Sequence, residues 1–238
     1  MPLTLTTGHV LLRTVPLLVF ALVGCSHVAD GLDPVVGQLN RYQQARSAGN
    51  WQAITDEAPV SDCQPVLEGC AKLYAIYGEA NQHLAFASLA PNAFCPPPGA
   101  NGRLNTAVAS YSKSEQLGDA SLTPAGKVSL KNLQAQALYC LAENASSIEQ
   151  GKVFVRQSAE QATALSRADA LFWQAMSQLY LARPGAGNDA QRCAAARSAD
   201  EAARAAQRLG VNSEQSQTLD RVSHDADQLH HLIIGCTE

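Results

Sequence analysis

One pattern of side chains occurs twice in the second half of the chain, and its two copies are 40 residues apart. Residues 173–180 have the i, i+3, i+4 and i+7 spacing of one helix face, and residues 133–140 carry the matching set. Small residues, mostly alanine, recur at matching positions of residues 195–202 and 155–162. A fixed period of this size is typical of stacked-repeat proteins, so we expect an all-α fold built from pairs of helices.

The composition of the chain suits one helical domain and excludes some partners. The 238 residues are 46% hydrophobic and 5% aromatic, which is sufficient for a single hydrophobic core. Abundant alanine favours helices that pack closely together. The formal net charge is −4, so electrostatic attraction draws the chain neither to nucleic acid nor to an anionic membrane.

The first residues are typical of an export signal. Arg13 precedes an apolar run, residues 15–23, which is broken only by Pro16 and is too short to span a membrane. The run ends in Leu22-Val23-Gly24-Cys25, which resembles a bacterial lipobox and implies cleavage before Cys25 and lipidation of its sulfur. An ordinary secretory peptide would instead leave Cys25 as a spare thiol. By the sorting pattern of enteric lipoproteins, Ser26 in place of Asp implies the outer membrane.

These signals divide the chain into a lipoprotein signal peptide (1–24), a lipidated cysteine with a short tether (25–33) and a single helical-repeat domain (34–238). Periodicity, caps and prolines predict the helices of that domain. They are Pro34–Ser47, a short helix from Trp51 ended by Pro59, Pro65–Leu89, Gly102–Leu117, Pro124–Ser146, Glu149–Ser166, Ala168–Arg183, Asp189–Leu209 and Ser213–Gly235 with Ser213 as its N-cap. Prolines in residues 91–100 predict a long loop.

The helix pairs resemble tetratricopeptide and, more closely, Sel1-like repeats. The resemblance is carried by residues 107–113 with 117–120, and by residues 168–170, 179–181 and 185–189. It implies a right-handed solenoid of antiparallel helix pairs with a C-terminal capping helix. Gln136 and Cys140 depart from the apolar and aromatic residues usual in their positions. An irregular helical bundle is the alternative.

Six cysteines follow Cys25, and in an exported chain they suggest three disulfides with 15 possible pairings. The solenoid geometry that the resemblance implies favours the sequential pattern Cys63–Cys70, Cys95–Cys140 and Cys193–Cys236. Buried free thiols are the alternative. No C-x2-C pair is present, which argues against a structural zinc site.

No catalytic motif is found in the chain, so we expect no enzyme activity, no catalytic residue and no cofactor. The last helix places an apolar stripe, Leu219, Val222, Ala226, Leu229, Ile233 and Cys236, opposite a polar one, Asp220, His224, Asp227 and His231. Imidazole and carboxylate groups at this spacing could hold a divalent metal. We expect instead no metal and a solvated face, because a terminal helix must turn a polar side to water.

The expected function is that of a lipid-anchored scaffold on the periplasmic face of the outer membrane, which binds a periplasmic or outer-membrane protein or peptide in envelope assembly or secretion. Alternatives are a hydrolase acting on cell-wall material and a pilotin-like escort of a secretion pore. The resemblance assigns partner binding to inward residues of the first helices: Lys72, Glu79, Gln82, His83, Lys131, Gln134, Leu138, Gln174 and Gln178. The loop around Cys95 is the alternative position of the binding site.

Overall fold

The computed structural model describes residues 34–60, 63, 68–91, 93–118, 120–233 and 236. The predicted signal peptide, Cys25 and the tether lie outside these residues. In the described part the fold is all-helical and its helices pack in sequence-adjacent pairs, which confirms the all-α part of the expectation. Its elements are α2 (Pro34–Ser47), α3 (Trp51–Thr55), α4 (Cys70–Phe86), the 3-10 turn η1 (Pro98–Ala100), α5 (Asn101–Leu117), α6 (Pro124–Glu143), α7 (Ile148–Ala162), α8 (Arg167–Leu181), α9 (Asp189–Leu209) and α10 (Ser213–Leu232).

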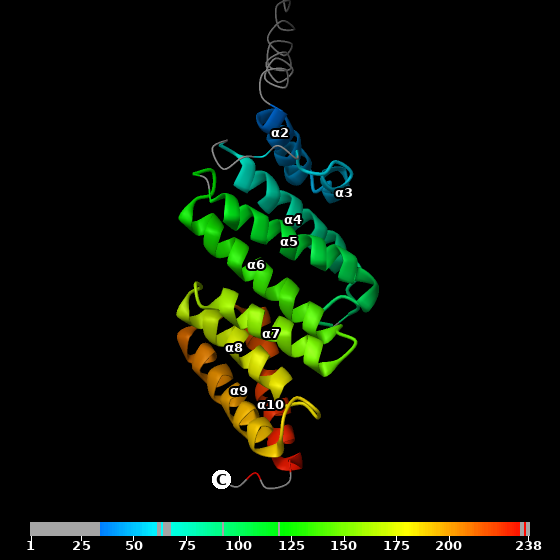
Figure 1. Cartoon of the computed structure of the whole chain (residues 1–238). Coiled ribbons are helices and arrows are strands. Elements are labelled where there is room, and N and C mark those ends of the chain that lie inside the picture. Colours follow the sequence, from blue (N-terminus) through cyan, green and yellow to red (C-terminus); the bar gives the residue numbers. More distant parts are fainter. Residues whose placement is uncertain are drawn as a thin grey trace, which may run out of the picture.

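The helices are stacked in sequence order along an elongated molecule. Figure 1 shows α2 at one end and α9 with α10 at the other. Neighbours in sequence form the main contacts, above all α4 with α5, α6 with α7, and α8 with α9. The last helix, α10, packs against both α9 and α8, and therefore adds a second layer at the C-terminal end.

Local caps explain where most of these helices begin and end. Asn188 and Gln191 form a capping box at the start of α9, and Gly210, with φ of 83°, ends it at the predicted residue. A second capping box makes Asn212 the N-cap of α10, so the prediction of Ser213 was wrong by one residue. The predicted helix ending at Ser166 stops at Ala162, because the Ser166 side chain caps α8.

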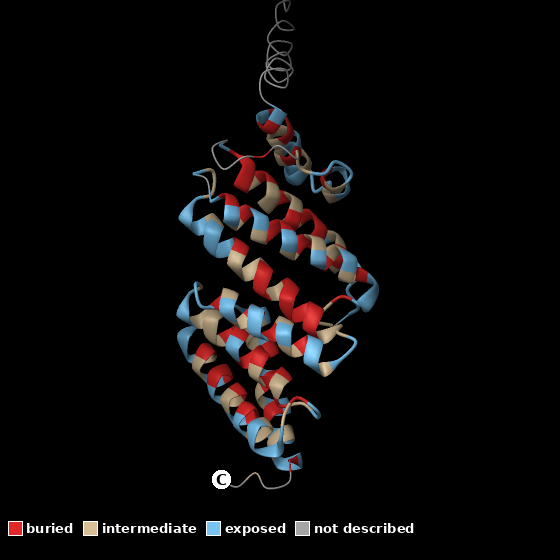
Figure 2. Cartoon of the chain, in the orientation of Figure 1, coloured by how far each residue is buried: buried red, intermediate tan, exposed pale blue. Residues whose placement is uncertain are grey.

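The hydrophobic core lies between successive helices rather than at one centre. Figure 2 shows buried positions along the facing sides of the helices. In α9 all six buried positions are alanine, including Ala199, Ala202, Ala203 and Ala206, which lets this helix approach its neighbours closely. Opposite them, Leu219, Val222 and Ala226 of the predicted apolar stripe of α10 are buried.

Close packing between α4 and α5 depends on a glycine. A Cβ atom at Gly78 would lie 2.6 Å from the ring of Tyr111, which is fully buried. Tyr111 Oη donates a hydrogen bond of 2.7 Å to Gln82 Oε1, also on α4. Ser114 adds a hydrogen bond of 2.6 Å to the carbonyl of Ala71. These contacts fix the spacing of α4 and α5.

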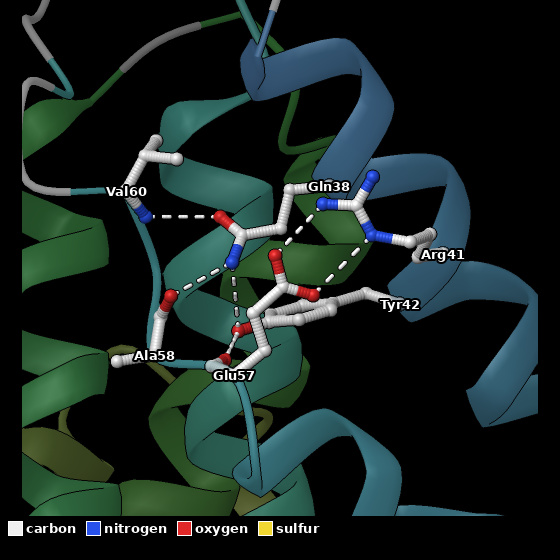
Figure 3. Close-up of polar contacts among 6 residues, drawn as sticks. All are labelled: Gln38, Arg41, Tyr42, Glu57, Ala58 and Val60. Atoms are coloured by element: carbon white, nitrogen blue, oxygen red, sulfur yellow. Dashed lines mark hydrogen bonds and ion pairs between the residues drawn. The ribbon is translucent and has the colours of Figure 1, made fainter. Parts of the chain in front are cut away.

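The N-terminal end is closed by a polar clamp between α2 and the segment that follows α3. Gln38 is 1% exposed; its Nε2 donates to the Ala58 carbonyl at 2.7 Å, and its Oε1 accepts from the Val60 N–H at 2.9 Å (Figure 3). Tyr42 Oη donates to the Glu57 carbonyl, and burial raises the pKa of this hydroxyl. A buried side-chain amide thus supplies the hydrogen bonds that this irregular segment cannot make for itself.

Three disulfides join Cys63 to Cys70, Cys95 to Cys140 and Cys193 to Cys236. This is the sequential pairing favoured from the sequence. The second disulfide ties the loop before α5 to the buried end of α6, and the third ties the start of α9 to the chain beyond α10.

Candidate functional site

Three residues of the predicted partner-binding row are buried and do not form an open polar surface. Gln82, Gln134 and Leu138 are 3–4% exposed. Gln82 contacts Tyr111 and donates to Gln136 at 2.9 Å, while Gln134 donates to Ser112 Oγ at 3.0 Å. Gln82 and Gln134 thus join neighbouring helices, Leu138 is buried, and the role of these three residues in binding a partner stays a prediction.

The other six members of the row are at least partly exposed, and the side chains of three of them, Glu79, His83 and Lys131, have intramolecular partners. Lys131 pairs with Glu115 at 2.5 Å and donates to Gln161 at 2.7 Å. His83 stacks on Trp51 with ring centroids 4.0 Å apart. Gln174 is exposed and Gln178 is half-buried.

Two residues of the row, Lys72 and Glu79, line a hollow of about 250 Å³ between α4 and α6. Its wall includes Tyr111, Ile76 and Leu130, and Glu79 is held there by Arg46 at 2.9 Å. The hollow combines an apolar base with a charged rim.

A longer depression, which we call the groove, lies between α6, α8, α10 and the loop before η1. It consists of two hollows that share Phe94 and Thr218. The amide hollow, about 160 Å³, is lined by Phe94, Asn132, Gln136, Phe172, Trp173, Asn212, Glu214, Gln215 and Thr218. The second hollow, about 380 Å³, which we call the Tyr139 hollow, is lined by Ala93, Phe94, Cys95, Tyr139, Glu143, Asn144, Met176, Leu179, Arg183, Thr218, Arg221, Val222 and Asp225.

Two side-chain amides of α6 present hydrogen-bond donors to the amide hollow. Asn132 Oδ1 accepts from Trp173 Nε1 at 2.8 Å, and Gln136 Oε1 accepts from Gln82 at 2.9 Å. These contacts orient both amides, and the structure gives neither Asn132 Nδ2 nor Gln136 Nε2 an acceptor among the described residues. Oriented N–H groups of this kind suit carbonyl or carboxylate oxygens.

The lining of the Tyr139 hollow includes an ion pair. Arg183 donates to both carboxylate oxygens of Glu143, at 2.8 and 2.7 Å, and Tyr139 Oη donates to the same carboxylate at 2.6 Å. Burial, together with the nearby Glu143 carboxylate, raises the pKa of Tyr139 well above its usual value. The Tyr139 hydroxyl therefore stays protonated at neutral pH and serves as a donor.

Phe94 forms the ridge between the two hollows. Its ring lies 5.8 Å from Tyr139 and 6.2 Å from Trp173, measured between centroids. The adjacent disulfide of Cys95, and a hydrogen bond of 3.0 Å from Asn144 to the Pro96 carbonyl, hold the loop against α6. The sequence placed an alternative site at this loop, but did not identify Phe94.

The polar stripe of α10 is exposed along its length. Asp227 and His231 are 67% and 75% exposed and lie 3.5 Å apart, and His224 contacts Gln228 at 2.9 Å. Within the described residues, no group of three His, Cys, Asp or Glu side chains is arranged to hold a metal ion. Asp227 also borders a hollow of about 250 Å³ between α9 and α10. None of the described helices is both long and apolar enough to cross a membrane.

Comparison with protein-family models, curated proteins and solved structures found no match to this chain.

Proposed function

We propose that the protein is a scaffold that binds an extended segment of another polypeptide in the groove along α6. The observation that carries this proposal is the pair of oriented amides, Asn132 and Gln136, beside two adjoining hollows. An extended chain presents carbonyl oxygens at regular intervals, and side-chain amides can bind them without specifying a sequence.

The size of the groove fits this occupant. From Asn132 to Glu143, α6 rises about 16 Å at 1.5 Å per residue. An extended chain covers that length with about five residues at 3.3 Å each. Both hollows therefore lie within reach of one short segment.

We further propose that α2 to α9 form a right-handed solenoid of degenerate tetratricopeptide- or Sel1-like pairs, with α10 as the cap. The sequence-adjacent pairs support this arrangement. A recurring contact supports it too: Ser114 donates to the Ala71 carbonyl between α4 and α5, and Ser158 donates to the Ala135 carbonyl between α6 and α7.

The proposed place of action is the periplasmic face of the outer membrane, with the protein anchored through lipid on Cys25. The lipobox supports the anchor, and the three disulfides support an oxidising compartment such as the periplasm. Cys25→Ser should abolish incorporation of labelled palmitate into the protein. Unchanged labelling of that variant would refute the anchor.

The groove is tested by photo-crosslinking in intact cells. A benzophenone side chain is introduced at Glu214, on the amide hollow, or at Asp225, on the Tyr139 hollow; both positions are exposed. Val153 on α7, which is 51% exposed and lines neither hollow, is the matched control.

The proposal requires that both groove positions crosslink to one continuous segment of the same partner, as mapped by mass spectrometry, and that Val153 does not. Crosslinks from Val153 alone would place the partner elsewhere. Crosslinks from the two groove positions to unrelated segments would exclude a single extended chain.

A further inference from the structure

We infer that the amide hollow takes a neutral peptide unit and rejects a carboxylate, and that Glu214 sets this preference. The inference deepens the proposed function, on which it rests for the polypeptide that carries the peptide unit. It means that this part of the groove binds the main chain of an internal stretch of the partner, and neither the partner's carboxyl-terminal group nor an acidic side chain.

Two chains of hydrogen bonds end in donors at the wall of the hollow that α6 forms. Tyr111 Oη donates to Gln82 Oε1 at 2.7 Å, and Gln82 Nε2 donates to Gln136 Oε1 at 2.9 Å. Trp173 Nε1 donates to Asn132 Oδ1 at 2.8 Å. Because an indole N–H can only donate and the Gln136 oxygen is already used, both α6 amides are left with NH₂ groups for a ligand.

The first turn of α10 brings an acceptor to the same hollow. Glu214 lies in that turn, and α10 packs mainly against α9 and α8. Its carboxylate is exposed, and the structure gives it no partner among the described residues. The neighbouring polar side chains are already engaged: Asn212 accepts from the Gln215 N–H, Gln215 Nε2 donates to Asp169, and Thr218 Oγ1 donates to the Glu214 carbonyl.

Donors on α6 and an acceptor on α10 suit a trans peptide unit, whose C=O and N–H groups point in opposite directions. Its carbonyl oxygen would accept from Asn132 and Gln136, and its N–H would donate to Glu214. The volume of about 160 Å³ is below the range of about 300–1,000 Å³ that is usual for whole ligands. The hollow therefore admits one unit of a longer chain.

The charges around the hollow disfavour a carboxylate. Glu214 is the one charged side chain among the described residues that line the amide hollow. The arginines of the groove, Arg183 and Arg221, line the Tyr139 hollow, and Arg183 is paired with Glu143 at 2.7 Å. A bound carboxylate would lie near a like charge, whereas a peptide unit would gain a charge-assisted hydrogen bond.

Trp173 provides the measurement, because its indole N–H is bonded to Asn132. The full chain labelled with ¹⁵N in its tryptophans gives two indole NMR signals, from Trp51 and Trp173, which Trp51→Phe tells apart. The probes are acetyl-proline N-methylamide, acetyl-proline N,N-dimethylamide and acetyl-proline. They share one body, but the first has a single N–H, the second has none, and the third ends in a carboxylate.

We expect the methylamide to shift the Trp173 signal saturably and to leave the Trp51 signal in place. The carboxylate probe should bind about fivefold more weakly, which corresponds to the repulsion of about 1 kcal/mol between like charges about 4 Å apart in water. The dimethylamide should bind about tenfold more weakly, because it cannot donate to the Glu214 carboxylate. Glu214→Gln should bring the methylamide and the carboxylate within about twofold. The control is Glu201→Gln, at an exposed position of α9 that lines neither hollow, and it should keep the preference.

Four results would overturn the inference: no saturable shift of the Trp173 signal with the methylamide, equal or tighter binding of the carboxylate probe, equal binding of the dimethylamide, or a preference that Glu214→Gln leaves unchanged. Failure of the proposed function gives a different pattern. In that case the probes bind as expected, while crosslinking from Asp225, where Glu214 is intact, finds no continuous polypeptide segment.

Discussion

Replacing Gln38 by alanine should loosen the N-terminal end of the molecule more than any nearby surface change. The side chain is 1% exposed and supplies the partners of the Ala58 carbonyl and the Val60 N–H. Each of the two lost hydrogen bonds contributes about 1 kcal/mol to stability. We therefore expect Gln38→Ala to lower the free energy of unfolding by about 2 kcal/mol.

The matched control is Arg41→Ala, in the same clamp but at the surface. Arg41 forms an ion pair of 2.7 Å with Glu57, and both side chains are nearly half exposed. Such a pair contributes about 0–1 kcal/mol because water screens it. Both side chains hold the same segment after α3. The difference between the two variants in the free energy of unfolding therefore measures the effect of burial.

The assay is urea unfolding followed by tryptophan fluorescence. The chain has two tryptophans: Trp51 lies in α3, beside the clamp, and Trp173 lies in α8. Trp51→Phe and Trp173→Phe backgrounds separate the two signals. Gln38→Ala should shift the Trp51 transition more than the Trp173 transition. Equal costs for Gln38→Ala and Arg41→Ala would refute the reasoning.

Three other measurements follow from the structure. Removing the second disulfide with Cys95→Ser and Cys140→Ser should lower the free energy of unfolding in urea by about 4 kcal/mol. Removing the Cys63–Cys70 disulfide should lower it by about 2.5 kcal/mol, because these cysteines are seven residues apart and close a shorter loop. Equal losses would contradict this. Gln134→Ala should lower the melting temperature, whereas exposed Gln174→Ala should leave it within about 1 °C, since surface changes cost less than about 0.5 kcal/mol. The pKa of Tyr139 is raised in the folded state, so the unfolded state loses the hydroxyl proton at lower pH than the folded state does. The free energy of unfolding should therefore fall as pH rises above about 10. In unfolding curves taken from about pH 8 to 11, Tyr139→Phe should make this fall smaller.

Most of the fold could be predicted because its signals are local. The capping box at Asn188 and the glycine at Gly210 fix both ends of α9 without help from the rest of the molecule. Helix ends without such a signal were predicted less well. The predicted end of α6 at Ser146 lies three residues past the observed end at Glu143.

The groove could not be predicted in the same way, because α6 lacks one clear polar face. Residues 137–142 are all buried, so the sequence there shows no periodicity that marks an open side. The repeat spacing placed Gln134 and Leu138 on the surface that binds the partner. In the structure, the side of α6 that lines the amide hollow carries Asn132 and Gln136 instead. Phe94 belongs to a loop that the Cys95–Cys140 disulfide holds against α6, and the packing of the aromatic cluster places its ring beside α8.

The positions of the disulfides determine how the molecule would carry tension. If the chain is pulled from its two ends, force passes through a closed disulfide and bypasses the residues inside the loop. Residues 96–139 and 194–235 are bypassed in this way. They include α5, most of α6 and all of α10, so most of two of the three helices that form the groove carries no load. Outside those loops, α2 and α3 would peel away first, with the Gln38 clamp as the first mechanical resistance.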